Sequence, residues 1–233
     1  MTTSIKGISS MATRQLLTEL VASYREIVAC DIAIEAVGGV DAARRVQAGE
    51  AFDMVVLASD AIDKLIITGH VDSTSKVDLV NSGVAIAVKT GAAQPDISTE
   101  EAVKAAVLAV VSAGNYISYS TGPSGVAVAA LFERWGIAEQ IASRIVQAPP
   151  GVPVGLLLAN GEAELGFQQL SEFIHEDGIS IVGPLPPEIQ ITTTFSAGVC
   201  LASRQASTVR DLLAFMTSPD AIPAKLRQGM EVI

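Results

Sequence analysis

The chain has 233 residues, of which 49% are hydrophobic and 17% charged, enough apolar material for one large α/β domain or two small lobes and too little charge for disorder. Its formal net charge of -10 disfavours nucleic acid and anionic membranes as partners, because both attract clustered lysine and arginine and the sequence has no basic run. Aromatic residues make up 4%, so valine, isoleucine, leucine and alanine are predicted to fill the cores, as is typical of parallel sheets.

Strands and helices are predicted to alternate along the first third of the chain. The predicted segments are 4–8, 12–24, 32–37, 42–48, 54–58 and 61–68. Short apolar runs followed by amphipathic stretches are typical of βαβ units, and the crossover rule then gives a parallel sheet. This part of the chain is therefore predicted to form a first lobe.

Two long β-branched runs, 79–89 and 192–202, are predicted to be strands that cross between two lobes. The segments predicted between them are helices at 100–113, 125–135 and 152–160 and strands at 116–119 and 163–167. Two further helices, 208–216 and 219–228, are expected to return to the first lobe. The predicted division is 1–82 plus 200–233 for lobe one and 83–199 for lobe two, with a ligand cleft between the lobes.

Small residues follow each predicted strand at the point where a helix begins. They are Ser9 and Ser10, Gly38 and Gly39, Ala58 and Ser59, and, in lobe two, Thr121, Gly122, Pro123 and Ser124. Ligands of open α/β sheets bind beyond the carboxyl ends of the strands, and the free N–H groups of helix N-termini attract anions. These turns are therefore predicted to bind one small anion together, although serine, threonine and aspartate are also ordinary helix caps.

Three longer polar side chains are further candidates for ligand contact. Arg44 is expected in the first turns of the helix after Gly39, where its guanidinium can reach a carboxylate, although a solvated helix face explains it as well. Gln168 and Gln169 end a predicted strand, and buried amides there require hydrogen-bond partners. We expect the ligand to supply some of those partners.

Metal and nucleotide cofactors are not expected. His70 and His175 are isolated, and the sequence has no HExxH motif, no Walker lysine motif and no GxGxxG. The two cysteines, Cys30 and Cys200, lie beside apolar residues and are predicted to be buried thiols rather than a disulfide.

No membrane insertion is expected either. The longest apolar stretch, 102–113, contains Lys104 and is shorter than the roughly 20 residues that span a bilayer. The residues at the start do not resemble a signal peptide, so the chain as written is expected to be cytoplasmic, or periplasmic if an export signal has been removed. A transporter is an expected partner only in the second case.

Read in order, the turns resemble those of the molybdate-binding type of bacterial solute-binding protein, a class II two-lobed family with an aconitate isomerase-like branch. The matching segments are Ile8-Ser9-Ser10, Leu57-Ala58-Ser59-Asp60, Thr121-Gly122-Pro123-Ser124-Gly125 and Gly166-Phe167-Gln168-Gln169. The resemblance implies an α/β fold of the type II periplasmic-binding-protein kind, each lobe a mostly parallel sheet flanked by helices. The pair Gly38-Gly39 stands where the family has a serine and Gln169 where it has a tyrosine, which favours a carboxylate ligand over a tetrahedral oxyanion.

Two functions follow from this resemblance. The first is binding of a small di- or tricarboxylate or oxyanion, which needs no catalytic base. The second is an aconitate isomerase that moves an allylic proton between the cis and trans isomers, for which Glu172, His175 and Ser10 are unranked candidate bases. A ligand-sensing domain that signals to a partner protein is a third, more distant possibility.

Overall fold

The computed structural model describes residues 3–233, which divide into two compact units. Unit 1 comprises Met1–Ser82 and Thr193–Ile233, and unit 2 comprises Gly83–Thr192. The sequence placed residues 193–199 in lobe two, but they belong to β9 (Thr192–Val199), which pairs antiparallel with β3 (Met54–Ala58) of unit 1. This pairing moves the second boundary from 200 to Thr193. Residues 1 and 2, expected to begin the first lobe, lie outside the described residues.

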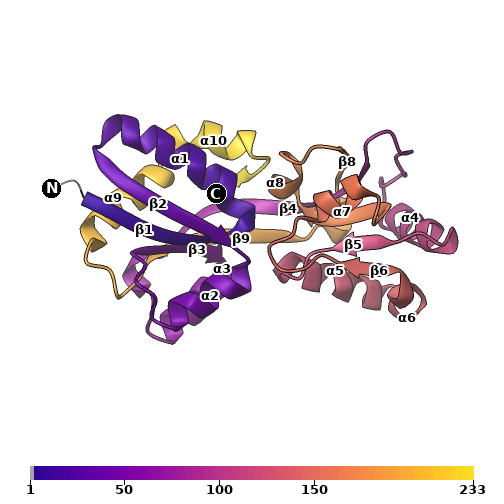
Figure 1. Cartoon of the computed structure of the whole chain (residues 1–233), viewed down its shortest axis with the longest axis horizontal. Coiled ribbons are helices and arrows are strands. Elements are labelled where there is room, and N and C mark those ends of the chain that lie inside the picture. Colours follow the sequence, from indigo (N-terminus) through magenta and orange to yellow (C-terminus); the bar gives the residue numbers. More distant parts are fainter. Residues whose placement is uncertain (1–2) are drawn as a thin grey trace. The chain divides into compact units, whose positions relative to one another are not determined.

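Unit 1 is a sheet covered by helices on both faces (Figure 1). Its strand order is β2-β1-β3-β9-β4, in which β1 pairs parallel with β2 and β3. The strands are β1 (Thr3–Ser10), β2 (Cys30–Val37), β3, β9, the first part of β4 (Val77–Lys89) and β10 (Glu231–Val232), which pairs with β4. The helices are α1 (Arg14–Ile27), α2 (Gly39–Gln47), α3 (Ser59–Ile67), α9 (Ala206–Met216) and α10 (Ile222–Arg227).

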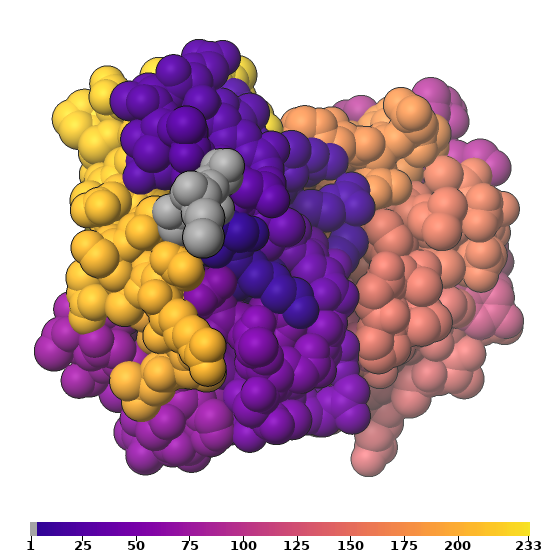
Figure 2. Space-filling view, turned by 60° about the vertical axis from the view of Figure 1, so that its left-hand side comes forward, coloured from indigo at the N-terminus to yellow at the C-terminus, as the bar shows by residue number. Residues whose placement is uncertain are grey.

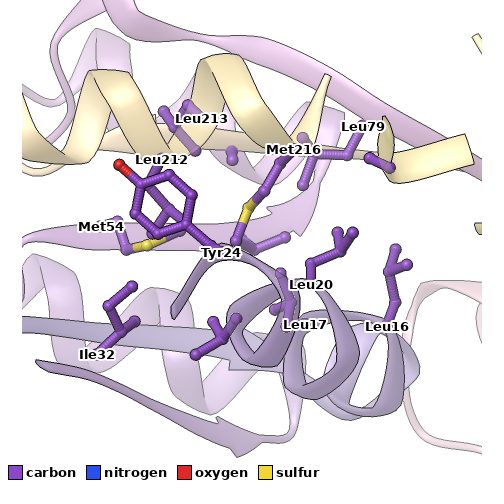
Figure 3. Close-up of a cluster of buried hydrophobic side chains, with 14 of the residues drawn as sticks. Leu16, Leu17, Leu20, Tyr24, Ile32, Met54, Leu79, Leu212, Leu213 and Met216 are labelled. Atoms are coloured by element: carbon purple, nitrogen blue, oxygen red, sulfur yellow. The ribbon is translucent and has the colours of Figure 1, made fainter. Parts of the chain in front are cut away.

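Two hydrophobic cores fill the space on either side of the unit 1 sheet. On one face, α1 and α9 pack against the strands through residues spaced three or four apart, so that each helix presents one apolar stripe. Figure 3 shows Leu16, Leu20 and Tyr24 of α1 facing Leu213 and Met216 of α9. On the other face, α2 and α3 bury a second cluster that includes Ile8 and Leu57. Successive residues of β1 therefore point into different cores.

The C-terminal segment of the chain lies against the N-terminal helix α1. Arg227 Nε donates a 2.7 Å hydrogen bond to Glu19 Oε1, and Gln228 Nε2 donates one of 3.1 Å to Glu19 Oε2. In the space-filling view the two segments lie side by side (Figure 2). The C-terminal segment is thus tied to α1 within unit 1.

Unit 2 repeats the arrangement of a sheet between two helical layers. Its strand order is β4-β7-β5-β6, with β8 also paired to β4, and β5 pairs parallel with β6 and β7. The strands besides β4 are β5 (Ile117–Tyr119), β6 (Ile145–Gln147), β7 (Leu165–Gln169) and β8 (Ile179–Pro184). The helices are α4 (Glu100–Ser112), α5 (Pro123–Arg134), α6 (Ala138–Ile141), α7 (Val154–Asn160) and α8 (Leu170–Phe173).

Every segment predicted from the sequence overlaps a helix or strand of its predicted type, but several short elements were missed. β6, β8, α6 and α8 were not predicted, because three to six residues give too little periodicity to distinguish an element from a loop. The start of α2 was also misplaced, since it begins at Gly39 rather than at residue 42. Both cysteines are buried and form no disulfide within the described residues, as predicted. Among residues 3–233, no helix is long and apolar enough to cross a membrane.

The core contacts of α1 lead to a first prediction. Leu20 is 1% exposed in the core against α9, whereas Leu201 is 59% exposed in the same unit. Leu20→Ala should lower the free energy of unfolding by about 2–5 kcal/mol, because it removes buried methyl groups and leaves a cavity. Leu201→Ala should change it by less than about 0.5 kcal/mol. Chemical denaturation measures both, and equal effects would contradict this packing.

Candidate functional site

Three strands of unit 1 end at the same edge of the sheet, and each leads into a helical turn. Ser10 pairs with Val37 in the parallel register of β1 and β2, and Ser9 pairs with Val56 of β3. The turns after these strands therefore lie next to one another. A methyl group placed on Gly39 would lie 3.7 Å from Cβ of Ser10, which shows how closely the first two turns approach.

The hydroxyl of Ser10 is buried beside these turns and has no hydrogen-bond partner among the described residues. Ser10 is 8% exposed, and its Oγ atom is inaccessible. It is the residue before the short helical turn Met11–Thr13, but its side chain makes no capping hydrogen bond. Ordinary helix capping therefore does not explain this serine, although capping was the alternative that the sequence left open.

Ser9 faces the opposite side of β1 from Ser10, because successive side chains alternate along a strand. Its neighbour Ile8 belongs to the core under α2 and α3, whereas Ser9 lines a groove with residues of α1. Its Oγ is likewise buried and has no hydrogen-bond partner in residues 3–233. The two serines, which the sequence predicted to share one site, therefore face different sides of the sheet.

The helices α2 and α3 both begin at this edge without a side-chain cap. The preceding residues are Gly38 and Ala58, which have no side-chain acceptor to offer. The first N–H groups of a helix have no intrahelical partner, so those of Gly39 and Ser59 are left as donors near the positive end of the helix dipole. Two helix starts beside one buried hydroxyl form an arrangement suited to an anion.

Arg44 does not lie where the sequence placed it. Because α2 begins at Gly39, Arg44 falls in the last turn of the helix rather than in its first turns. Its side chain is 77% exposed and forms an ion pair with Asp41, one turn earlier. Arg45 is also engaged, with Glu35 and Glu50. Both arginines are thus engaged with acidic residues, whereas the backbone amides at the two helix starts remain available as donors.

A turn in unit 2 shows a similar arrangement of serine and glycine. Oγ of Ser120 lies 3.4 Å from Oγ of Ser124, at the start of α5, and Ser124 is 6% exposed. Gly122 precedes the helix without a side-chain cap, and Pro123 occupies its first turn. Thr121 and Pro123 are exposed, so Ser124 is the buried hydroxyl of this turn. Ser120 begins this turn, and its hydroxyl lies beside that of Ser124, four residues further along the chain.

The two glutamines at the end of β7 differ in role. Oε1 of Gln168 accepts a 2.8 Å hydrogen bond from the amide of Val154, which begins α7, and its Nε2 donates a 2.7 Å bond to Glu172 Oε2. The protein itself therefore accounts for the burial of this amide, without a ligand. Gln169 is 3% exposed and is the last residue before α8. Parallel pairing of Tyr119 with Phe167 brings the end of β7 to the same edge as the Ser120 turn.

Other polar residues outside these turns have structural roles. Oγ1 of Thr194 donates to Asn81, and Oγ of Ser196 donates to Asp78, which ties β9 to β4 within unit 1. His70 lies 3.0 Å from the hydroxyl of Thr68 through its Nδ1. In the described part of the chain, no three His, Cys, Asp or Glu side chains form a group able to hold a metal ion.

The unpartnered hydroxyl of Ser10 gives a second prediction. Ser10→Ala should leave the free energy of unfolding of the ligand-free protein unchanged or raise it by up to about 1 kcal/mol, because no hydrogen bond is lost. Ser75→Ala is the matched control, since Oγ of Ser75 donates to Asp72 O at 2.7 Å and accepts from Val199 N at 2.8 Å. The control should lose about 1–3 kcal/mol in the same denaturation experiment. A similar loss for Ser10→Ala would mean that its hydroxyl is satisfied within the protein.

The contact beneath the Ser120 turn gives a third prediction. A Cβ on Gly125 would lie 1.7 Å from the carbonyl oxygen of Ser120, whereas one on Gly38 would meet nothing within 4 Å. Gly125→Ala should therefore displace the turn and cost about 1–3 kcal/mol or more, and Gly38→Ala should cost less than about 1 kcal/mol. Thermal unfolding of the two variants measures the difference.

Comparison with known proteins assigns the chain to a family. The sequence profile described as "Bacterial extracellular solute-binding protein" matches residues 5–231. An aconitate isomerase from a Pseudomonas species is 36% identical over 190 residues, which cover 81% of this chain and 71% of that protein. The family resemblance seen in the sequence is thereby confirmed.

Solved structures extend the likeness to the whole fold. The periplasmic molybdate-binding protein of Azotobacter vinelandii superposes with a TM-score of 0.79 at 17% identity, over 98% of this chain and 99% of that one. A sulfate-binding protein of Mycobacterium tuberculosis gives 0.78 at 14% identity, over 99% and 87%. The predicted α/β fold of the two-lobed, type II periplasmic-binding-protein class is confirmed. The chain belongs to the bacterial extracellular solute-binding protein family.

Proposed function

We propose that the protein binds a small carboxylate-bearing anion with donors at the helix starts of unit 1 and at the Ser120 turn of unit 2. The observation that carries this proposal is the buried, unpartnered hydroxyl of Ser10 beside the uncapped starts of α2 and α3. A carboxylate or oxyanion accepts hydrogen bonds from such hydroxyls and amides. Ser10, Gly39 and Ser59 are the proposed donors of unit 1.

Unit 2 is proposed to complete the site with Gly122, Ser124 and Gln169. The first two lie at the start of α5, and Gln169 ends the neighbouring strand β7 at the same sheet edge. Hydroxyl and amide donors of this kind would replace the water that solvates the free anion. The likeness to molybdate- and sulfate-binding proteins supports this arrangement at the level of the fold.

A di- or tricarboxylate is the proposed ligand class. The pair Gly38-Gly39 stands where the resemblance implies a serine, so one donor suited to a compact tetrahedral oxyanion is missing and the space beside the pair is larger. Nothing lies within 4 Å of a Cβ on Gly38, which leaves room for a ligand with a carbon skeleton. Gln169 offers both a donor and an acceptor, which suits a second carboxyl or hydroxyl group.

The ligand class is testable by exchange of a single residue. Wild-type protein should bind trans-aconitate more tightly than molybdate in isothermal titration calorimetry. Gly38→Ser adds a hydroxyl at the start of α2 and should shift the preference toward molybdate by about fivefold or more, the equivalent of one net hydrogen bond. Ser10→Ala should weaken both ligands by about 1–3 kcal/mol. Unchanged affinity in Ser10→Ala would remove this hydroxyl from the site and end the proposal.

A second candidate function, interconversion of cis- and trans-aconitate, is supported by the 36% identity to an aconitate isomerase. In this reaction a base takes a proton from the methylene carbon, the charge spreads onto the conjugated carboxylate, and the proton returns to the other end of the allylic system while the double bond moves. Amide and hydroxyl donors around the carboxylates would stabilise the charge that develops. The anion site described above would thus serve both functions.

Of the three candidate bases, the structure favours Glu172. Ser10 has no hydrogen-bonded base to take its proton, and His175 is exposed. Glu172 lies in α8, directly after the strand end at Gln169, and Gln168 Nε2 donates to its Oε2 and orients the carboxylate. A general base must be held within reach of the carbon-bound proton, and this bond provides such positioning.

The test of this second function is proton exchange. Protein incubated with trans-aconitate in D2O should convert it to cis-aconitate and incorporate deuterium at the methylene carbon, as followed by proton NMR. Glu172→Gln should abolish the exchange and retain binding, and Glu176→Gln on the same unit serves as the control. If trans-aconitate binds and stays unchanged over hours, the protein is a binding protein without this activity.

A pure binding function would pass the captured solute to a transporter, since several similar proteins belong to ABC transporters. The tungstate ABC transporter structure of Geobacter sulfurreducens, for example, has a TM-score of 0.73 at 13% identity over 95% of this chain and 97% of that one. A transporter partner is therefore proposed for an exported form of the protein.

A further inference from the structure

Unit 1 contains a groove of about 270 Å³ between α1 and β2, on the face of β1 opposite to Ser10. β2 is the outermost strand in the order of this sheet. The walls of the groove are mainly apolar and include Leu17 and Val21 of α1 and Ile32 and Ile34 of β2. The lining contains two arginines, Arg14 and Arg25, and no acidic residue. In a chain of net charge -10, this combination singles out the groove as a place for an anion.

The two arginines stand at opposite ends of the groove and are not equivalent. They are eleven residues apart on α1, which corresponds to about 16 Å along the helix axis. Arg25 Nη2 donates to Ile32 O at 2.6 Å and to Asp31 Oδ1 at 3.3 Å, so its guanidinium is already used. The guanidinium of Arg14, the first residue of α1, has no ion pair or hydrogen bond within the described residues.

Ser9 lines the groove as well, from β1. Its side chain is fully buried, and its Oγ has no hydrogen-bond partner among the described residues. In the sheet register Ser9 pairs with Ala36, which also lines the groove, and Arg14 follows shortly after Ser9 in the chain. A buried hydroxyl and an unpaired guanidinium thus line the same groove, although they belong to different elements. Core packing alone does not account for an unsatisfied hydroxyl at this position.

We propose that this groove is a second binding site, for a small monoanion with an apolar tail, of the medium-chain monocarboxylate class. The carboxylate would accept hydrogen bonds from Arg14 and Ser9, and the tail would lie along the apolar walls toward Arg25. The single unpaired guanidinium of Arg14 balances the single negative charge of a monocarboxylate. The volume falls just below the range of about 300–1,000 Å³ that is typical of pockets for drug-sized ligands, which indicates a small ligand. This inference does not rest on the proposed function, since Ser10 faces the other core.

Calorimetry with octanoate tests the proposal, with octanamide as the neutral probe of the same length. Wild-type protein should bind octanoate at least tenfold more tightly than octanamide. Arg14→Gln should weaken octanoate binding by about tenfold or more, since it removes the charge-assisted hydrogen bond. Arg204→Gln is the matched control, because Arg204 is exposed in the same unit and lies outside the groove. The control should bind octanoate as the wild type does.

The serine is tested in the same way. Ser9→Ala should weaken octanoate binding about fivefold, whereas Ser118→Ala, which removes another fully buried and unpartnered hydroxyl, should leave it unchanged. Saturating trans-aconitate should not displace octanoate. Absence of octanoate binding by the wild type, equal losses in Arg14→Gln and Arg204→Gln, or displacement by trans-aconitate would each overturn the proposal. Failure of trans-aconitate to bind would bear only on the other site.

Discussion

Among the described residues, the buried hydroxyl of Ser10 has no hydrogen-bond partner, and the free-energy cost of burying it unpaired is the constraint on which the candidate anion site depends. A buried polar group that makes no hydrogen bond costs about 1–3 kcal/mol, which a core alanine would avoid. The same sheet edge carries two helices that begin without a side-chain cap. Donors that the fold leaves unsatisfied at one place are readily explained by a ligand that accepts from all of them.

This arrangement also reconciles an acidic protein with an anionic ligand. The net charge of -10 sets the potential far from the surface, but a buried site responds mainly to the donors that line it. The acidic residues nearest to the two helix starts, Asp41 and Asp60, form ion pairs with Arg44 and Lys64 one turn further along their helices. These pairs hold the carboxylates along the helix surface. The amides of the first turn can then donate hydrogen bonds to the anion.

Much of the fold could be predicted from the sequence, because strands and turns are marked by short local patterns of residues. Apolar runs of four to eight residues marked the strands, and Ser, Gly and Pro marked the turns, so the fold class and the turn at Ser124 followed. What the sequence could not give depends on side-chain direction and partners. The opposite orientation of Ser9 and Ser10 needed the register of β1, and the internal role of Gln168 needed the neighbouring start of α7.

The position of Arg44 shows how an error in a predicted helix start changes the interpretation of a residue. A shift of three residues in the start of α2 moved this arginine from the first turns to the last, and with it from a candidate ligand contact to a surface ion pair. Helix boundaries are the least reliable part of any prediction from sequence, because weak helix formers such as glycine can still begin a helix when the tertiary packing favours it. A site residue near a helix end is therefore misplaced whenever the predicted end of the helix is wrong.

The central claim is that the uncapped starts of α2 and α3 and the hydroxyl of Ser10 receive one anion together. Titration of isotope-labelled protein with trans-aconitate, followed by the backbone amide resonances, tests it most directly. The account predicts that the amide protons of Gly39 and Ser59 move downfield together with a single dissociation constant, and that Ser10→Ala weakens both shifts equally. Shifts confined to other parts of unit 1, or different dissociation constants for these two amides, would contradict it.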